Sequence, residues 1–142
     1  MFINAYKLEL EKADGSTVAV SLRVGIRGQK KLAEKFGGEA TTATFFAATD
    51  DLDRLIAILH EALNYTGNDN TIKSGEDLAD LLFMNDMLGM LPKQRLLTNI
   101  ARHSGIFTEV EADALMKAVE RRFEKLIGNE EIEEEEEPEK NA

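Results

Sequence analysis

Apolar and polar residues alternate along the first 26 residues of the chain. Residues 3–12 read INAYKLELEK, residues 17–26 read TVAVSLRVGI, and the short segment between them contains Asp14-Gly15. Alternation with a period of two is typical of β-strands, and Asp-Gly suits the tight turn of an antiparallel hairpin. We therefore predict a hairpin with one apolar face that another part of the chain must cover. That face is predicted to consist of Tyr6, Leu8, Leu10, Val18, Val20, Leu22, Val24 and Ile26.

The next two segments give different signals. Residues 27–38, RGQKKLAEKFGG, predict a short helix that stops at Gly37-Gly38, because glycine adopts the left-handed conformation without a steric penalty. Residues 39–49, EATTATFFAAT, are rich in threonine and phenylalanine. Both residue types favour extended structure, so we predict a third strand or an extended loop there.

From Asp50 onward the apolar residues recur with the period of helices, and the pattern predicts four longer helices. The first starts with acidic residues and stops at Gly67, the second is capped by Ser74, and the third accepts Pro92 in its first turn. Thr108 and the residue three positions later form a capping box for the last helix. The stripes are predicted as Leu52, Leu55, Ile56, Leu59 and Leu63 in the first helix, and Val110, Ala114, Leu115, Ala118, Val119, Phe123, Leu126 and Ile127, up to Gly128, in the last.

Together these elements predict an α+β fold, with an N-terminal antiparallel β-hairpin as a small sheet and a mainly helical body of about four to five helices. Residues 129–142 contain eight glutamates and one lysine, a charge of −7, which leaves −3 of the total of −10 for residues 1–128. Because adjacent like charges repel and bury no apolar surface, we predict a single domain at 1–128 and a disordered acidic tail at 129–142.

Composition excludes several classes of function. With no cysteine, the chain has no disulfides, no thiolate metal sites and no cysteine nucleophile. No apolar run approaches the roughly 20 residues that span a bilayer, and the first residues lack the apolar core of a signal peptide, so we expect a cytoplasmic protein without a membrane partner. The acidic chain has no basic cluster beyond Lys30-Lys31 and Arg121-Arg122, which argues against nucleic acid as a partner.

Catalytic signals are weak as well. His60 and His103 are the two histidines, and Asn64 stands where a zinc-protease motif would need a second histidine. The polar loop that follows Asn68 does not match a calcium-binding loop, and Gly25 and Gly28 lack the remaining residues of a dinucleotide or phosphate motif. We therefore expect no enzyme activity, no catalytic residues, no metal and no cofactor.

One helix carries more apolar surface than a single core stripe requires. LADLLFMNDMLGML, at residues 78–91, is apolar around most of its circumference and holds three of the five methionines. Methionine side chains adapt to partners of varied shape. A helix buried on several sides would explain the pattern equally well, and both readings can hold together. We predict that the partner-binding residues are Phe83, Met84, Met87 and Met90.

The order of these segments resembles the tail assembly chaperones of long-tailed phages and prophages of Gram-positive bacteria. The resemblance covers residues 1 to about 127 and is carried by the hairpin leading into LRVGIRGQKKLAEKFG, by DDLDRLIAILHEAL and by NYTGNDNTIKSGEDLADLL. It implies a non-enzymatic homo-oligomer of the host cytoplasm that binds the tape-measure protein, keeps it soluble and promotes tube assembly. The tail tube protein is a further candidate partner, and the chaperone is absent from the mature virion.

The resemblance also suggests a second meaning for the end of the chain. Members of this family often have a longer form that is made by a programmed ribosomal frameshift, and Glu139-Lys140-Asn141 can be encoded by a slippery A AAA AAC heptamer. A tail selected only for its charge is the alternative, and the codons of the gene distinguish the two. For the whole protein, the alternative function is a structural tail or head-completion protein that is retained in the virion.

Overall fold

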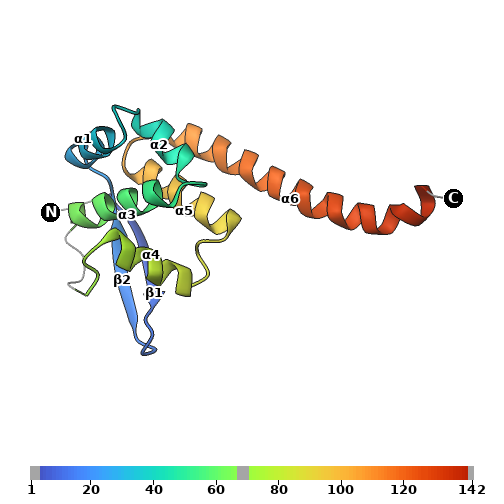
Figure 1. Cartoon of the computed structure of the whole chain (residues 1–142), viewed down its shortest axis with the longest axis horizontal. Coiled ribbons are helices and arrows are strands. Elements are labelled where there is room, and N and C mark those ends of the chain that lie inside the picture. Colours follow the sequence, from blue (N-terminus) through green and yellow to red (C-terminus); the bar gives the residue numbers. More distant parts are fainter. Residues whose placement is uncertain (1–3, 67–70, 141–142) are drawn as a thin grey trace.

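The computed structural model describes residues 4–66 and 71–140 and has the predicted α+β architecture. An antiparallel hairpin precedes a helical body from which the last helix projects (Figure 1). The described residues form six helices, one more than the upper predicted number. The strands are β1 (Tyr6–Glu11) and β2 (Thr17–Leu22), and the helices are α1 (Ile26–Lys35), α2 (Thr41–Ala47), α3 (Leu52–Thr66), α4 (Gly75–Met84), α5 (Met90–His103) and α6 (Glu109–Lys140).

The hairpin has the predicted register and turn. Leu8 pairs with Val20 and Leu10 with Val18, so apolar side chains from both strands share one face. Gly15 has a φ of 86°, the conformation that favours glycine in such a turn. The predicted hairpin is therefore confirmed, and its apolar face is covered by helices.

The second strand ends earlier than predicted, at Leu22. Val24 is still buried, but its N–H donates to the hydroxyl of Ser104 at 2.8 Å instead of to a strand. The Ser104 hydroxyl donates in turn to the carbonyl of Ile100. Ile26 is the first residue of α1 and is exposed. The prediction that Ile26 belongs to the covered apolar face of the hairpin is therefore wrong.

Residues 41–47 form helix α2, so the prediction of a third strand or a loop is wrong. The buried positions Thr44, Phe45 and Ala48 have helical spacing, and α2 packs against α1, α3 and α5. The Thr44 hydroxyl donates to the Glu39 carboxylate at 2.7 Å. Burial of one face by neighbouring helices outweighs the low helix propensity of threonine and phenylalanine.

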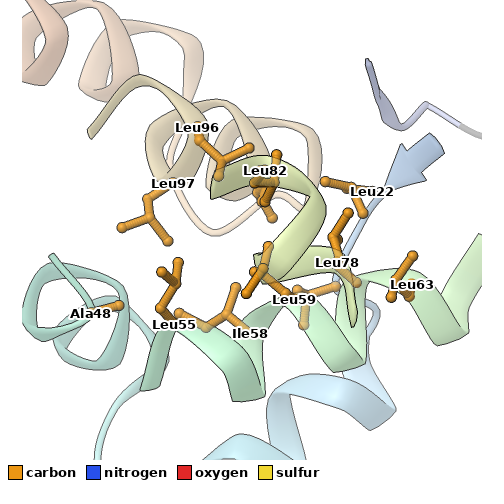
Figure 2. Packing of buried hydrophobic residues seen from close by; sticks show 14 of the residues in the cluster. Leu22, Ala48, Leu55, Ile58, Leu59, Leu63, Leu78, Leu82, Leu96 and Leu97 are labelled. Carbon is orange, nitrogen blue, oxygen red and sulfur yellow. The ribbon is translucent and has the colours of Figure 1, made fainter. Parts of the chain in front are cut away.

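Helix α3 lies at the centre of the core and packs against α1, α2, α4 and β2. Its buried stripe includes Leu55, Ile58, Leu59 and Leu63, while Leu52, predicted to be on this stripe, is exposed. Figure 2 shows the buried side chains of this stripe packing against side chains from the other elements. The labelled residues are Leu22, Ala48, Leu55, Ile58, Leu59, Leu63, Leu78, Leu82, Leu96 and Leu97.

Helix α6 begins at the predicted capping box and runs well past its predicted end. The Thr108 N–H donates to the Glu111 carboxylate at 2.9 Å, and the Glu111 N–H donates to the Thr108 hydroxyl at 3.1 Å. The helical backbone continues to Lys140, beyond Gly128, where the predicted apolar stripe ends. The division between a domain at 1–128 and a disordered tail at 129–142 stays a prediction.

Candidate protein-binding surface

The predicted partner-binding residues lie where α4 ends and α5 begins. Phe83 is 72% exposed, Met84 54% and Met90 63%, whereas Met87 is partly buried and packs against the core. We call these four residues the corner patch. Three of its members are therefore open to solvent, and the fourth lies partly in the core.

Helix α4 is buried on one face and open on the other. The Ser74 hydroxyl accepts the N–H of Asp77 at 3.1 Å, which is the predicted cap, and Leu78 and Leu82 are fully buried. Phe83 and Met84 follow directly but are exposed. One part of this apolar segment is therefore core and another part lies on the surface, and partner binding by the exposed part stays a prediction.

Asn85 fixes the end of α4 against the hairpin. Its side-chain amide donates to the Glu11 carbonyl at 3.0 Å and to the Leu81 carbonyl at 2.8 Å, and its side-chain oxygen accepts the Glu11 N–H at 2.9 Å. Asp86 then has a φ of 57°, and the Met87 N–H donates to the Leu82 carbonyl at 2.9 Å. This turn holds the corner patch in a defined position.

A groove lies between the start of α5 and the outer part of α6, next to Met90 in the chain. It has a volume of about 330 Å³, and the Arg95 guanidinium lies 3.6 Å from the Glu120 carboxylate within its lining. We call it the α5/α6 groove. Its lining residues are Leu91, Arg95, Glu120, Phe123, Glu124, Ile127 and Gly128.

This groove was not predicted from the sequence, because the apolar stripe of α6 was expected to be covered by the body of the protein. Leu126 and Ile127 are exposed, and Val110 at the other end of the stripe is 78% exposed. The stripe spans residues 110–127 of α6, which are 18 positions, whereas α5 has 14 residues, so α5 cannot cover the whole stripe. The length of the stripe was the available signal.

A second apolar hollow of about 400 Å³ lies near the start of α6. The rings of Phe46 and Phe107 lie 5.6 Å apart there, and Phe46 is exposed. This hollow adds apolar surface that was not anticipated from the sequence. Its lining residues are Thr42, Phe46, Ile106, Phe107, Glu111, Ala114 and Leu115.

The two histidines have separate surroundings. Within α3, the His60 ring nitrogen Nε2 lies 3.1 Å from the side-chain amide nitrogen of Asn64. His103 is the last residue of α5, and its ring stacks on the ring of Tyr6 in β1. Burial lowers the pKa of His103, and the neighbouring charge of Arg102 lowers it further. The described residues contain no group of three or more histidines and carboxylates that could hold a metal ion.

Over residues 4–66 and 71–140, we find no helix that is both long and apolar enough to cross a membrane. Comparisons of the chain with protein-family models, with curated proteins and with solved structures give no match. The surface of the molecule is therefore the basis for a functional proposal.

Proposed function

We propose that this chain is a tail assembly chaperone of the kind found in long-tailed phages, and that it binds the tape-measure protein without covalent chemistry. The exposure of Phe83, Met84 and Met90 at one corner of the fold carries the proposal. Large apolar side chains that are exposed close together in the chain favour a protein-binding site, and flexible methionines suit a client with several apolar segments. The order of elements along the sequence supports the same function.

In this proposal an apolar helix of the client docks on the corner patch and extends into the α5/α6 groove. Met90 and Leu91 are consecutive residues that belong to the patch and the groove, respectively. Burial of each large apolar side chain contributes about 1.5–3 kcal/mol before the cost of association is subtracted. Several such contacts are needed for a stable complex, which favours a long client helix over a short peptide.

The test is co-expression with a tagged tape-measure protein encoded in the same tail gene cluster. Phe83→Asp combined with Met84→Asp should lower the soluble client at least tenfold, because two charges would replace apolar contacts. Leu52→Asp combined with Val110→Asp is the matched control, since both residues are also exposed but lie at the starts of α3 and α6. Equal client solubility with the patch variant and with wild type would exclude the corner patch as the binding site.

Location in the particle separates this proposal from a retained structural protein. A chaperone acts in the host cytoplasm and leaves before the virion is complete. Mass spectrometry of purified virions should therefore detect this chain only at trace level. Peptides at the abundance of a tail component would favour a structural role instead.

A further inference from the structure

Helix α1 carries a row of cations that form no ion pair within the described part of the chain. Arg27, Lys31 and Lys35 follow one another at intervals of four residues and are all exposed, so they lie on one face of the helix. None of the ion pairs within 4.0 Å that the structure describes involves these three residues. We call them the basic row. Together with Lys30 and Glu34 they give α1 a charge of +3.

The basic row borders a groove between α1 and α3. Two adjoining hollows of about 400 and 220 Å³ share Lys31 and Glu61 in their linings and extend along α1. Gly28 lets the helices approach, since a Cβ there would lie 3.2 Å from the Cβ of Glu61. Glu61 and Glu76 are the carboxylates of this lining, and Arg27, Lys31 and Lys35 are its cations.

One end of the groove is apolar. Ile26 is 74% exposed there, and Tyr65 is exposed as well. The Tyr65 ring occupies the space beside Gly25, where a Cβ would lie 2.5 Å from it, and the Arg23 guanidinium lies 5.5 Å from the ring centre. Gly25 and Gly28, which match no phosphate-binding motif, thus shape a groove that has cations along one side.

The acidic end of α6 has the charge and the length to occupy such a groove. Residues 129–142 carry −7, and the backbone from 129 to 140 is helical. In the sequence, Glu131, Glu135 and Glu139 have the same spacing of four residues as the basic row. A glutamate-rich helix alone is destabilised by repulsion between like charges four residues apart, and nearby cations offset that repulsion.

The acidic segment cannot reach the basic row of its own chain while α6 stays helical. Figure 1 shows α1 and the end of α6 at opposite ends of the molecule. We therefore infer that the acidic segment of one copy, residues 129–140, docks in the α1/α3 groove of a second copy. The contact joins two different surfaces, so it produces open chains or closed rings of copies, and the smallest ring is a dimer with two reciprocal contacts.

This inference goes beyond the chaperone proposal and is tested independently of a client. Sedimentation velocity at low ionic strength should show the mass of the wild-type chain rising with concentration above the 15.8 kDa monomer. In 0.5 M NaCl the assembly should dissociate, because screening weakens contacts between exposed charges. A wild-type chain that stays monomeric at millimolar concentration in low salt would overturn the inference.

Two full-length variants separate the two surfaces. One carries Arg27→Glu, Lys31→Glu and Lys35→Glu, and the other carries glutamine in place of all eight glutamates of residues 129–142. Each variant alone should be monomeric, because each retains only one of the complementary surfaces. In a mixture, the acidic segment of the basic-row variant can dock on the intact basic row of the glutamine variant. No second contact is possible in such a pair, so the mixture should form a 1:1 dimer and nothing larger.

The control variant, Lys7→Glu, Lys117→Glu and Lys125→Glu, has the same net charge as the basic-row variant but changes exposed cations elsewhere. It should assemble within twofold of the wild-type affinity. If the basic-row variant loses its circular dichroism signal, Arg27→Gln, Lys31→Gln and Lys35→Gln takes its place. Assembly of either single-surface variant on its own, or no dimer in the mixture, would overturn the inference.

Discussion

At the scale of single residues, glycines determine how closely the helices approach. Gly75 is the sharpest example, because a Cβ there would lie 2.1 Å from the carbonyl oxygen of Ile56 and 2.9 Å from the backbone nitrogen of His60. The start of α4 therefore rests directly on the backbone of α3. From the sequence, Gly75 was only the residue after a helix cap.

We predict that Gly75→Ala destabilises the fold by about 1–3 kcal/mol, the usual cost of forcing an extra carbon into a packed contact. The free energy of unfolding, measured with urea, checks this value. Gly128→Ala is the control, since a Cβ there has no neighbour within 4 Å. Equal stability of the two variants would mean that α3 and α4 can move apart without cost.

Arg54 ties the loop before α2 to the start of α3. It donates from Nε to the Glu39 carboxylate at 2.9 Å and also pairs with Asp51, while its guanidinium lies 4.6 Å from the centre of the Phe36 ring. Hydrogen bonds from Arg54 lower the pKa values of Glu39 and Asp51 below their ordinary values. The folded state therefore holds these two carboxylates in their charged form.

The pH dependence of stability follows from these lowered pKa values. The unfolded chain takes up protons at a higher pH than the folded chain, so the stabilisation is complete above about pH 5 and is lost as the pH falls through the folded pKa values. Arg54→Met should reduce the loss of unfolding free energy between pH 5 and pH 3. Urea titrations of both proteins measure that loss, and identical losses would contradict the role given to Arg54.

At the scale of elements, periodicity predicted the type of most helices and strands. The hairpin, α1, α3, α5, the Ser74 cap and the capping box of Thr108 and Glu111 were confirmed. The failure at α2 came from reading threonine and phenylalanine by propensity, because the neighbours that bury Thr44 and Phe45 are far away in the sequence. Propensity carries no information about such contacts.

Burial along the predicted stripes failed at helix starts and further along α6, where Ala114, Ala118, Leu126 and Ile127 are exposed. Ile26, Leu52 and Val110 all lie in the first two residues of a helix, and all are exposed. Periodicity identifies which face of a helix is apolar, but it does not show where along the axis the covering element begins. Tertiary contacts determine that point, and a single sequence does not contain them.

The side chain of Asn85 joins the end of α4 to β1 through hydrogen bonds. We predict that Asn85→Ala costs about 1–2 kcal/mol, since three hydrogen bonds are lost at a partly exposed position. The amide of Glu11 should then exchange with solvent faster, which hydrogen exchange measures directly. Asp86→Gly in the same turn is the control and should be neutral or slightly stabilising, because its φ of 57° suits glycine.

At the scale of the whole molecule, the sequence identified a surface but not its extent. Phe83, Met84 and Met90 were recognised because their helix had more apolar residues than a core stripe needs, and they are exposed. The α5/α6 groove and the α1/α3 groove were not recognised. Each is formed between two helices, so its existence depends on packing angles and lengths that a pattern along one helix does not reveal.

The projecting part of α6 should contribute little to the stability of the body. In 0.5 M NaCl, glutamine in place of the glutamates after residue 128 should change the unfolding free energy by less than about 0.5 kcal/mol, as expected for surface substitutions. Leu115→Ala is the comparison, because Leu115 packs against the core and should cost more. Thermal and urea unfolding measure both, and a large effect of the glutamine variant would place the acidic segment against the body.

The length of α6 has a consequence for spacing. At about 1.5 Å per residue, its 32 residues measure about 48 Å, which exceeds the diameter of a small domain. Because residues 129–140 would lie in the groove of the next copy, successive bodies would follow one another along the direction of α6. A long coiled client could then lie along the row and contact one corner patch in each copy.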